Sequence, residues 1–225
     1  MTDQSAIEAV GADYDRQTML KVRAMTRGAI DEIASAVHPG MPEDTAVQIT
    51  KDVLRKAGMV RGWHAPQVRF GVNTLKPFGA PSEPGVVLGE NDLFFLDIGP
   101  VWQQYEGDAG ATFAVGHDPE MLKIVTDVRR VFDDSRDAWL MRGLTGAGLY
   151  EFATNRAREL GWELNLDMNG HRLANFPHAA IHKGPLSDAP FKPSAALWVL
   201  EIQIRHPTRP FSAFYEDLLL EDAER

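Results

Sequence analysis

Cysteine is absent from this chain of 225 residues, which excludes disulfide bonds, thiolate metal sites and a cysteine nucleophile. Long apolar runs are also missing, because none approaches the roughly 18–20 residues that a membrane-spanning helix needs. The first residues, 1–11, lack the basic start and the apolar stretch of a secretory signal. These absences favour a cytoplasmic protein with no membrane partner.

Clusters of basic residues are scarce as well. The formal net charge is −9, and no run of Lys and Arg is longer than two residues. Because nucleic-acid binders normally present a basic face, we expect no nucleic-acid partner. With 44% hydrophobic and 24% charged residues, the composition is that of an ordinary globular protein with a substantial core.

The hydrophobic pattern is the first positive signal. Helical spacing of apolar residues predicts helices, and apolar runs or alternation predict strands. The order of two helices followed by paired strands occurs twice, which predicts one α+β domain of two similar halves, 1–225, with 1–14 as a loosely ordered extension. The predicted helices are 15–37, 43–57, 119–141 and 145–160, and the predicted strands are 93–97, 108–115, 196–205 and 212–220.

Acidic residues interrupt three of these strands. Asp97 ends LFFLD, Glu201 lies inside LWVLEIQI, and Glu216 lies inside AFYEDLLL. A buried carboxylate is costly unless it is paired, hydrogen-bonded or bound to a cation. Any one of them could face solvent on a half-exposed strand or pair with an arginine. Three interruptions in three core strands favour a shared cation instead.

Asp97 and Asp108 flank what the pattern predicts to be a tight return between two strands. Two carboxylates held that close repel each other, and one takes up a proton unless a cation lies between them. Oxygen ligands suit Mn²⁺, Fe²⁺, Co²⁺ or Mg²⁺, and an imidazole shifts the preference toward transition metals. His171 follows Gly170 in a loop-like stretch. A lone histidine is more often structural, but beside four misplaced acids we interpret it as a ligand.

The segment FLDIGPVWQQYEGDAGATFAVG resembles the paired-aspartate hairpin of the pita-bread metallohydrolases, which include methionine aminopeptidase, aminopeptidase P, prolidase and creatinase. The resemblance implies a curved, mainly antiparallel sheet covered by helices in two pseudo-symmetric halves. It also implies that His178 contacts substrate. The five metal ligands that it implies are Asp97, Asp108, His171, Glu201 and Glu216.

This ligand set implies two divalent metal ions, Mn, Co or Fe, with Zn as an alternative. In such a site a bridging water loses its proton easily and attacks an amide or peptide carbon. Glu201 is then the expected proton shuttle, and His178 is expected to steady the oxyanion. The resemblance therefore predicts a dinuclear metal-dependent hydrolase, aminopeptidase P-like or acting on a small amide, with a small-molecule or short-peptide substrate.

Two departures from the family pattern concern the substrate pocket. Phe78 stands between Pro77 and Gly79, where the family commonly has a histidine. The sequence after His171, GHRLANFPH, lacks the two glycines that usually follow the metal histidine. Both changes point away from an ordinary peptidase pocket. His64, in GWHAPQVRFG, either supplies a polar, catalytic group in the cleft or is a structural histidine.

Two other functions remain as alternatives. One is creatinase-like chemistry on a small C–N substrate without metal, and the other is a non-catalytic binding homologue of the fold. All five ligand positions are retained, which argues against both. We expect no separate N-terminal domain of the creatinase type, and we leave a homodimer open.

Overall fold

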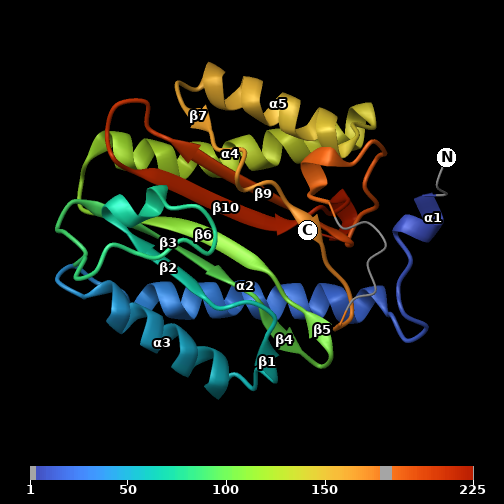
Figure 1. Cartoon of the computed structure of the whole chain (residues 1–225), viewed down its shortest axis with the longest axis horizontal. Coiled ribbons are helices and arrows are strands. Elements are labelled where there is room, and N and C mark those ends of the chain that lie inside the picture. The colour runs from blue at the N-terminus through green and yellow to red at the C-terminus, as the bar shows by residue number, and fades with distance from the viewer. Residues whose placement is uncertain (1–3, 178–183, 225) are drawn as a thin grey trace.

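A computed structural model describes residues 4–177 and 184–224. Its centre is a mainly antiparallel sheet in the order β2-β3-β6-β10-β9-β7, with β8 paired to β9. In the view of Figure 1 the helices lie toward the top and the bottom of the picture, with the strands between them. The strands are β2 (Gln67–Phe70), β3 (Asp92–Ile98), β6 (Ala109–Val115), β7 (Glu163–Leu164), β8 (His171–Arg172), β9 (Trp198–Arg205) and β10 (Ser212–Leu218).

Four long helices match the predicted ones to within two residues at each end. They are α2 (Arg16–Ala36), α3 (Glu43–Lys56), α4 (Pro119–Arg142) and α5 (Gly146–Glu159). Side chains cap three of them: Asp15 accepts from Thr18 N, Asp118 from Met121 N, and Thr145 from Gly148 N. These caps satisfy backbone donors that a helix start leaves free.

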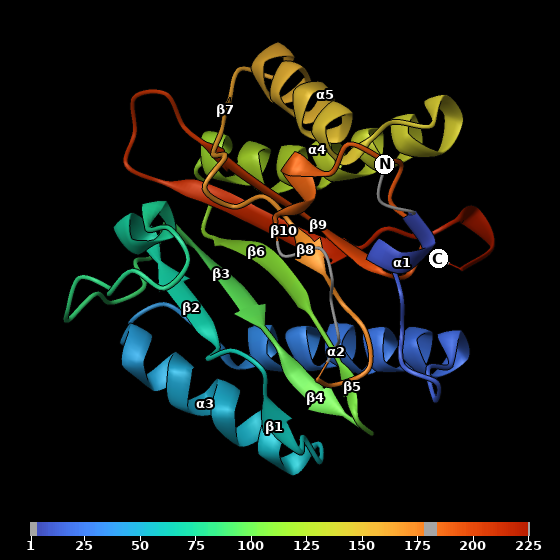
Figure 2. The same cartoon turned by 45° about the vertical axis from the view of Figure 1, so that its right-hand side comes forward.

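The two predicted halves are visible in Figures 1 and 2. In the first half α2 and α3 accompany β2, β3 and β6, and in the second α4 and α5 accompany β7, β9 and β10. β6 and β10 pair at the junction, so one sheet runs through both halves. The α+β prediction with two similar halves is confirmed.

The return between β3 and β6 is longer than the tight turn that the sequence suggested. β4 (Pro100–Trp102) and β5 (Tyr105–Glu106) form a hairpin arm, and β1 (Arg61–Gly62) pairs with β4 in a separate three-stranded sheet. Gln103 and Gln104, at the tip, have φ values of 50° and 67°. Two successive residues with positive φ form the turn that suits a two-residue hairpin, although glycine or asparagine usually occupies it.

One face of the sheet is covered by α2 and α4. Arg23 of α2 donates to both oxygens of Asp217 on β10, at 2.7 Å each, and Arg129 of α4 donates to the hydroxyl of Tyr215 at 2.7 Å. Successive side chains of a strand point to opposite faces. Glu216, between these two residues, therefore points to the face that the helices leave free.

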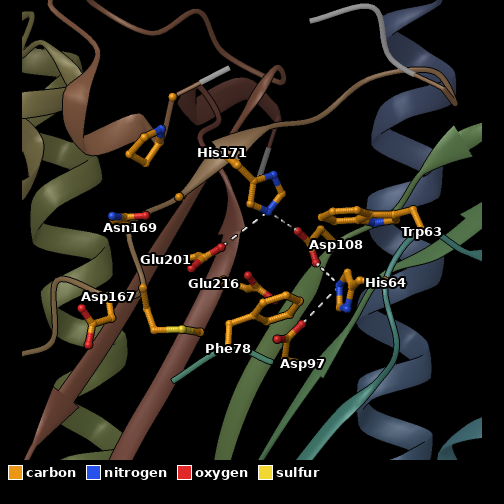
Figure 3. A pocket seen from close by; sticks show the side chains of 14 residues that line it. Trp63, His64, Phe78, Asp97, Asp108, Asp167, Asn169, His171, Glu201 and Glu216 are labelled. Carbon is orange, nitrogen blue, oxygen red and sulfur yellow. Dashed lines mark hydrogen bonds and ion pairs between the residues drawn. The ribbon is translucent and has the colours of Figure 1, made fainter. Parts of the chain in front are cut away.

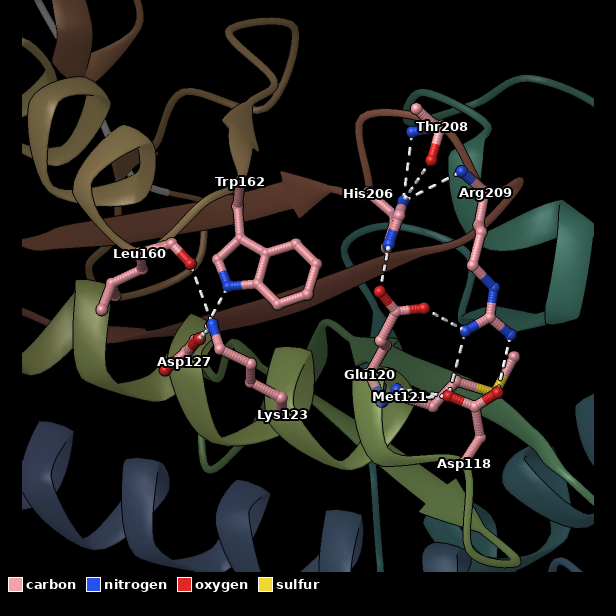
Figure 4. A network of polar contacts seen from close by, with 10 residues as sticks. All are labelled: Asp118, Glu120, Met121, Lys123, Asp127, Leu160, Trp162, His206, Thr208 and Arg209. Atoms are coloured by element: carbon pink, nitrogen blue, oxygen red, sulfur yellow. Dashed lines mark hydrogen bonds and ion pairs between the residues drawn. The ribbon is translucent and has the colours of Figure 1, made fainter.

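The turn between β9 and β10 is tied to the start of α4 by a group of charges, which we call the turn network (Figure 4). It consists of Asp118, Glu120, His206 and Arg209. Arg209 donates to both oxygens of Asp118, at 3.0 and 2.7 Å, and to Glu120 at 2.6 Å. His206 contacts Glu120 at 3.2 Å. The network links the turn of the β9–β10 hairpin to the start of α4.

The N-terminal residues that we expected to be loosely ordered include α1 (Gln4–Ile7) and the buried Glu8. The carboxylate of Glu8 accepts from Ser194 N at 2.8 Å and from Trp198 Nε1 at 2.7 Å. This segment therefore contacts the second half of the domain. Among the described residues, no helix is both long and apolar enough to cross a membrane.

Candidate metal centre

Strand register aligns three carboxylates across the free face of the sheet. Asp97 on β3 is opposite Gly110 on β6, Gly110 is opposite Glu216 on β10, and Glu216 is opposite Glu201 on β9. Directly opposed residues of antiparallel strands point to the same face. The three acids therefore form one row across four neighbouring strands, with a gap at Gly110.

Gly110 has to be small for the row to form. A Cβ at this position would lie 2.4 Å from Cε1 of Phe214 and 3.0 Å from Oε1 of Glu216. Asp108 precedes Gly110 by two residues and so points to the same face. We call Asp97, Asp108, Glu201 and Glu216 the carboxylate cluster.

Two histidines complete the group (Figure 3). The Nε2 atom of His171, on β8, lies 2.8 Å from Asp108 Oδ2 and 3.5 Å from Glu201 Oε1. The Nε2 atom of His64, which follows β1, lies 3.4 Å from Asp97 Oδ1 and 3.5 Å from Asp108 Oδ1. Two sets of three potential ligand atoms lie within 4.8 Å of one another: His64 with Asp97 and Asp108, and Asp108 with His171 and Glu216.

Most of the carboxylate cluster is buried, and no lysine or arginine of the described residues neutralises it. Asp97, Asp108 and Glu216 are only 2–3% exposed. Among residues 4–177 and 184–224, no Lys or Arg forms an ion pair with the cluster. Pairing with an arginine, the alternative that the sequence left open for these acids, is therefore not found among the described residues.

Two oxygens of the cluster, Asp108 Oδ2 and Glu216 Oε1, accept no hydrogen bond from the described residues. The first is close enough to His171 for an ion pair, but the geometry is not that of a hydrogen bond. Buried acceptors without donors are rare and costly. Oxygens in this arrangement fit a divalent cation, which is the group that this donor set prefers.

The electrostatics of the cluster are those of acids held too close together. Burial raises the pKa of Asp97 to about 6 and that of Glu201 to about 7. Burial, together with the charges of Asp108 and Asp97, raises the pKa of Glu216 well above its usual range. Burial acts to raise the pKa of Asp108 too, but His171 and His64 bring it below its usual value. One acid is thus held ionised and three hold protons more strongly.

The histidines respond in the opposite sense. Burial acts to lower the pKa of each ring, but Asp97 and Asp108 raise that of His64 to about 9, and Asp108 and Glu201 raise that of His171 to about 10. A cation bound among these groups displaces their protons and takes over the neutralisation of the carboxylates.

A cavity of about 290 Å³ opens over the carboxylate cluster. Phe78 lies at its rim, where the residue is 52% exposed and its ring stands edge-on to His64 with centroids 5.5 Å apart. His178 lies outside the described residues. The cavity lining also includes Trp63, Asp167, Met168, Asn169, Gly170, Gly184 and Pro185.

The structure thus brings together all five predicted ligands, and places Phe78 and His64 beside them. Trp63 was not predicted as part of the site. Its ring contacts both histidines, with ring centroids 4.5 Å from His64 and 5.0 Å from His171. No local pattern signals this contact, because the two histidines are far apart in the chain.

Arg172 was also missed. Its buried guanidinium donates to the carbonyl oxygens of Leu173, Leu197 and Glu8, at 2.8, 3.0 and 2.8 Å. These bonds fix the strand that carries His171. At this position, directly after His171, the family commonly has a glycine, whereas here Arg172 links β8 to the N-terminal segment.

Solved structures with this architecture include an X-Pro aminopeptidase and a methionine aminopeptidase, both from Thermotoga maritima. The first superposes with a TM-score of 0.73 and 18% identity, covering 97% of this chain and 63% of that one. The second gives a TM-score of 0.70 and 15% identity, covering 95% of this chain and 99% of that one. At such identities the likeness shows the fold, and the predicted pita-bread fold is confirmed.

Sequence comparison identifies the family. Methionine aminopeptidase 1 of Mycobacterium tuberculosis is 30% identical over 103 residues, which are 44% of this chain. The matched stretches span only 35% and 38% of the length of the two curated relatives found. The profile of metallopeptidase family M24, in contrast, matches residues 17–220. The chain belongs to metallopeptidase family M24.

Proposed function

We propose that this protein is a dinuclear metal-dependent hydrolase that cleaves an amide or peptide C–N bond. One observation carries the proposal: three buried carboxylates and the partly buried Glu201 converge with His171 on one cavity, and two of their oxygens accept no hydrogen bond from the described residues. Family membership supports it, because the family binds divalent metals. The aminopeptidase names of the relatives and structural neighbours give the substrate class that the test should start from.

Five groups would hold the ions between them. Asp97, Asp108, His171, Glu201 and Glu216 are the ligands that we assign. Mn²⁺, Co²⁺ or Fe²⁺ suits this mixture of carboxylate oxygens and imidazole nitrogen better than Mg²⁺ alone. When bound, such ions polarise a carbonyl oxygen and lower the pKa of a bound water.

The protein's own groups supply the proton transfers. Glu201, which lines the cavity beside His171, is placed to accept a proton and to return it. It lies at the floor of the cavity, so it can pass that proton to the leaving nitrogen. His178 keeps its predicted role of steadying the oxyanion, as an expectation from the sequence.

The rim of the cavity favours an apolar or flat substrate group. Trp63, Phe78, Met168 and Pro185 line the cavity beside the charged floor. Aromatic rings bind such groups through contact area and edge-to-face packing. A short peptide with an apolar side chain, or a small apolar amide, fits this lining. A cytoplasmic location stays a prediction from the sequence, which leaves a homodimer open.

The test is metal reconstitution followed by a substrate panel. Metal-free protein is loaded with Mn²⁺, Co²⁺, Fe²⁺ or Zn²⁺, bound ions are counted, and Xaa-Pro peptides, Met-peptides, small amides and creatine-like amidines are assayed. We expect about two ions per chain and hydrolysis that Glu201→Gln abolishes. Metal-free turnover of an amidine would favour creatinase-like chemistry. Less than about half an ion per chain, with no turnover, would favour a binding homologue.

A further inference from the structure

His64 and His171 have the same local geometry, one in each half of the molecule. The Nδ1 atom of His64 lies 2.9 Å from the carbonyl oxygen of Ala65, and that of His171 lies 2.9 Å from the carbonyl oxygen of Arg172. A carbonyl oxygen only accepts, so each Nδ1 carries a proton and donates it. In the neutral ring the lone pair is then on Nε2, which in both cases faces the carboxylate cluster.

This tautomer is the one that metal-binding histidines adopt, with the second nitrogen held by a backbone carbonyl or carboxylate. A buried histidine elsewhere in the chain has the opposite arrangement. Nδ1 of His206 accepts from Thr208 N at 3.1 Å and from Arg209 N at 2.9 Å, so its Nε2 donates to Glu120. His206 is therefore oriented as a structural donor, and His64 is not.

Asp108 lies between the two histidines in Figure 3. Its Oδ1 is 3.5 Å from His64 Nε2, and its Oδ2 is 2.8 Å from His171 Nε2. His64 Nε2 is also 3.4 Å from Asp97 Oδ1. Each oxygen of Asp108 thus faces a different imidazole.

The two separations at His64 are long for hydrogen bonds, which span about 2.7–3.2 Å. Two ligand atoms bound to one ion at about 2.1 Å, with angles of about 90–110°, lie roughly 3.0–3.4 Å apart. The distances of 3.4 and 3.5 Å from His64 to Asp97 and Asp108 are close to that spacing. All three atoms lie within 4.8 Å of one another, which is close enough for one ion to bind them together.

The surroundings of His64 hold its ring in this place. A Cβ at Gly99 would lie 2.1 Å from His64 Cδ2 and 2.3 Å from Nε2, so the ring occupies space that only a glycine leaves free. Trp63 packs edge-on against the ring, and its Nε1 donates to Gly107 O at 2.9 Å. The side chain of His64 is only 9% exposed. A ligand held by packing and by a backbone acceptor meets the requirement for a preorganised site.

We propose that His64 is a sixth metal ligand, which binds the ion held by Asp97 while His171 binds the other. This inference rests on the proposed dinuclear site. Asp108, which has one imidazole beside each of its oxygens, would then contribute to the binding of both ions. An imidazole on both ions shifts the preference of the whole site away from Mg²⁺ and toward transition metals.

Paramagnetic NMR of the cobalt-loaded full chain tests the assignment. A histidine bound through Nε2 to Co²⁺ gives a strongly shifted Nδ1–H resonance, which a backbone acceptor protects from exchange with water. We expect His64→Gln to remove one shifted, exchangeable resonance and His171→Gln to remove another. His206→Gln is the matched control, because that histidine is also buried beside a carboxylate, and it should remove none.

The outcomes separate this inference from the proposed function. If the wild type binds cobalt but His64→Gln leaves every shifted exchangeable resonance in place, His64 is not a ligand and the proposed site stands. If the wild type gives no shifted resonance at all, both fail. Cobalt titration gives a second readout, in which His64→Gln should weaken one of the two binding steps by about 10–100-fold.

X-ray absorption of the wild type keeps the inference testable if the variant does not fold. The cobalt spectrum should contain about one imidazole per ion, whereas His171 alone would give about half that value. The lower value would overturn the assignment.

Discussion

The carboxylate cluster and the turn network both gather acids, but only the turn network pairs them with an arginine. In the turn network Arg209 lowers the pKa of Asp118 to about 2 and also lowers that of Glu120. In the carboxylate cluster, burial raises the pKa values of Asp97, Glu201 and Glu216. Acids are thus neutralised by a permanently charged arginine in one region, and in the other by histidines whose protons a bound cation would displace. The difference marks a region built for stability and a region built for binding.

Among the substitutions that test this difference, Glu216→Gln should have the largest effect on metal binding and activity. The substitution keeps the shape of the side chain but removes a proposed ligand from the strand that lies between β6 and β9. We expect loss of bound metal and a fall in kcat/KM of more than about a thousandfold, comparable to losing a central electrostatic group. Metal analysis and the rate on the best substrate measure it.

The same variant should not be less stable than the wild type without metal. A folded-state pKa above the usual value means that Glu216 destabilises the fold as pH rises through the usual range for Glu, and that glutamine removes this cost. Urea unfolding of both metal-free proteins at pH 8 checks it. A variant that unfolds more easily than the wild type would show that Glu216 is a structural residue.

The effect of pH on metal binding comes next in size. Glu201 and His171, with pKa values near 7 and 10, hold protons in the metal-free protein around neutral pH, and these must leave when metal binds. The apparent affinity should therefore fall as pH falls, by about tenfold per pH unit for each proton displaced. Cobalt titrations at pH 6, 7 and 8 measure this slope. An affinity that does not change with pH would contradict the proposed ligand set.

Of the two regions, only the carboxylate cluster could be predicted from the sequence. The carboxylate cluster was predictable because Asp97, Glu201 and Glu216 break apolar strands, and burial makes such interruptions expensive. The long helices were predictable because their apolar periodicity and their caps agree. The turn network was not, because Arg209 pairs with residues about ninety positions earlier in the chain.

Two features near the metal centre were also beyond the sequence. The arm of β4 and β5 turns on Gln103 and Gln104, which carry none of the glycine or asparagine signals of such a turn. The position of Trp63 between the two histidines depends on the meeting of the two halves. Local patterns report burial and periodicity, whereas these features depend on long-range packing.

Phe78→His sharpens the comparison at the edge of the carboxylate cluster. A histidine here restores a donor and acceptor at the rim, where phenylalanine offers neither. If a peptide group is left unpaired at this point, restoring its hydrogen bond gains roughly 1–3 kcal/mol, or about one to two decades in rate. We expect Xaa-Pro and Met-peptides to be cleaved faster by that factor, with the gain in kcat/KM.

The control for Phe78→His is Val72→His, which adds a histidine to an exposed position before the same loop. It should leave the rates unchanged. If the wild type already cleaves these peptides at roughly 10 per second, phenylalanine at this position is harmless, and this interpretation of the rim is wrong.

The smallest effect should come from Arg209→Met, which breaks the turn network and leaves the carboxylate cluster intact. Asp118 is close to solvent, so the pair should contribute less than about 1 kcal/mol. Its pKa lies near 2 when folded and near 3.8 when unfolded, so this contribution is present above about pH 4 and is lost as pH falls toward 2. In Arg209→Met the free energy of unfolding should therefore depend less steeply on pH between 4 and 2. Urea unfolding across that range measures the slope.

Arg158→Met is the matched control, because Arg158 donates to the amide oxygen of Asn155 and not to a carboxylate. Metal content and activity at pH 7 should stay at wild-type levels in both variants. A loss of metal in Arg209→Met alone would mean that the turn network also positions Glu201 and Glu216, and that the two regions are coupled through the β9–β10 hairpin.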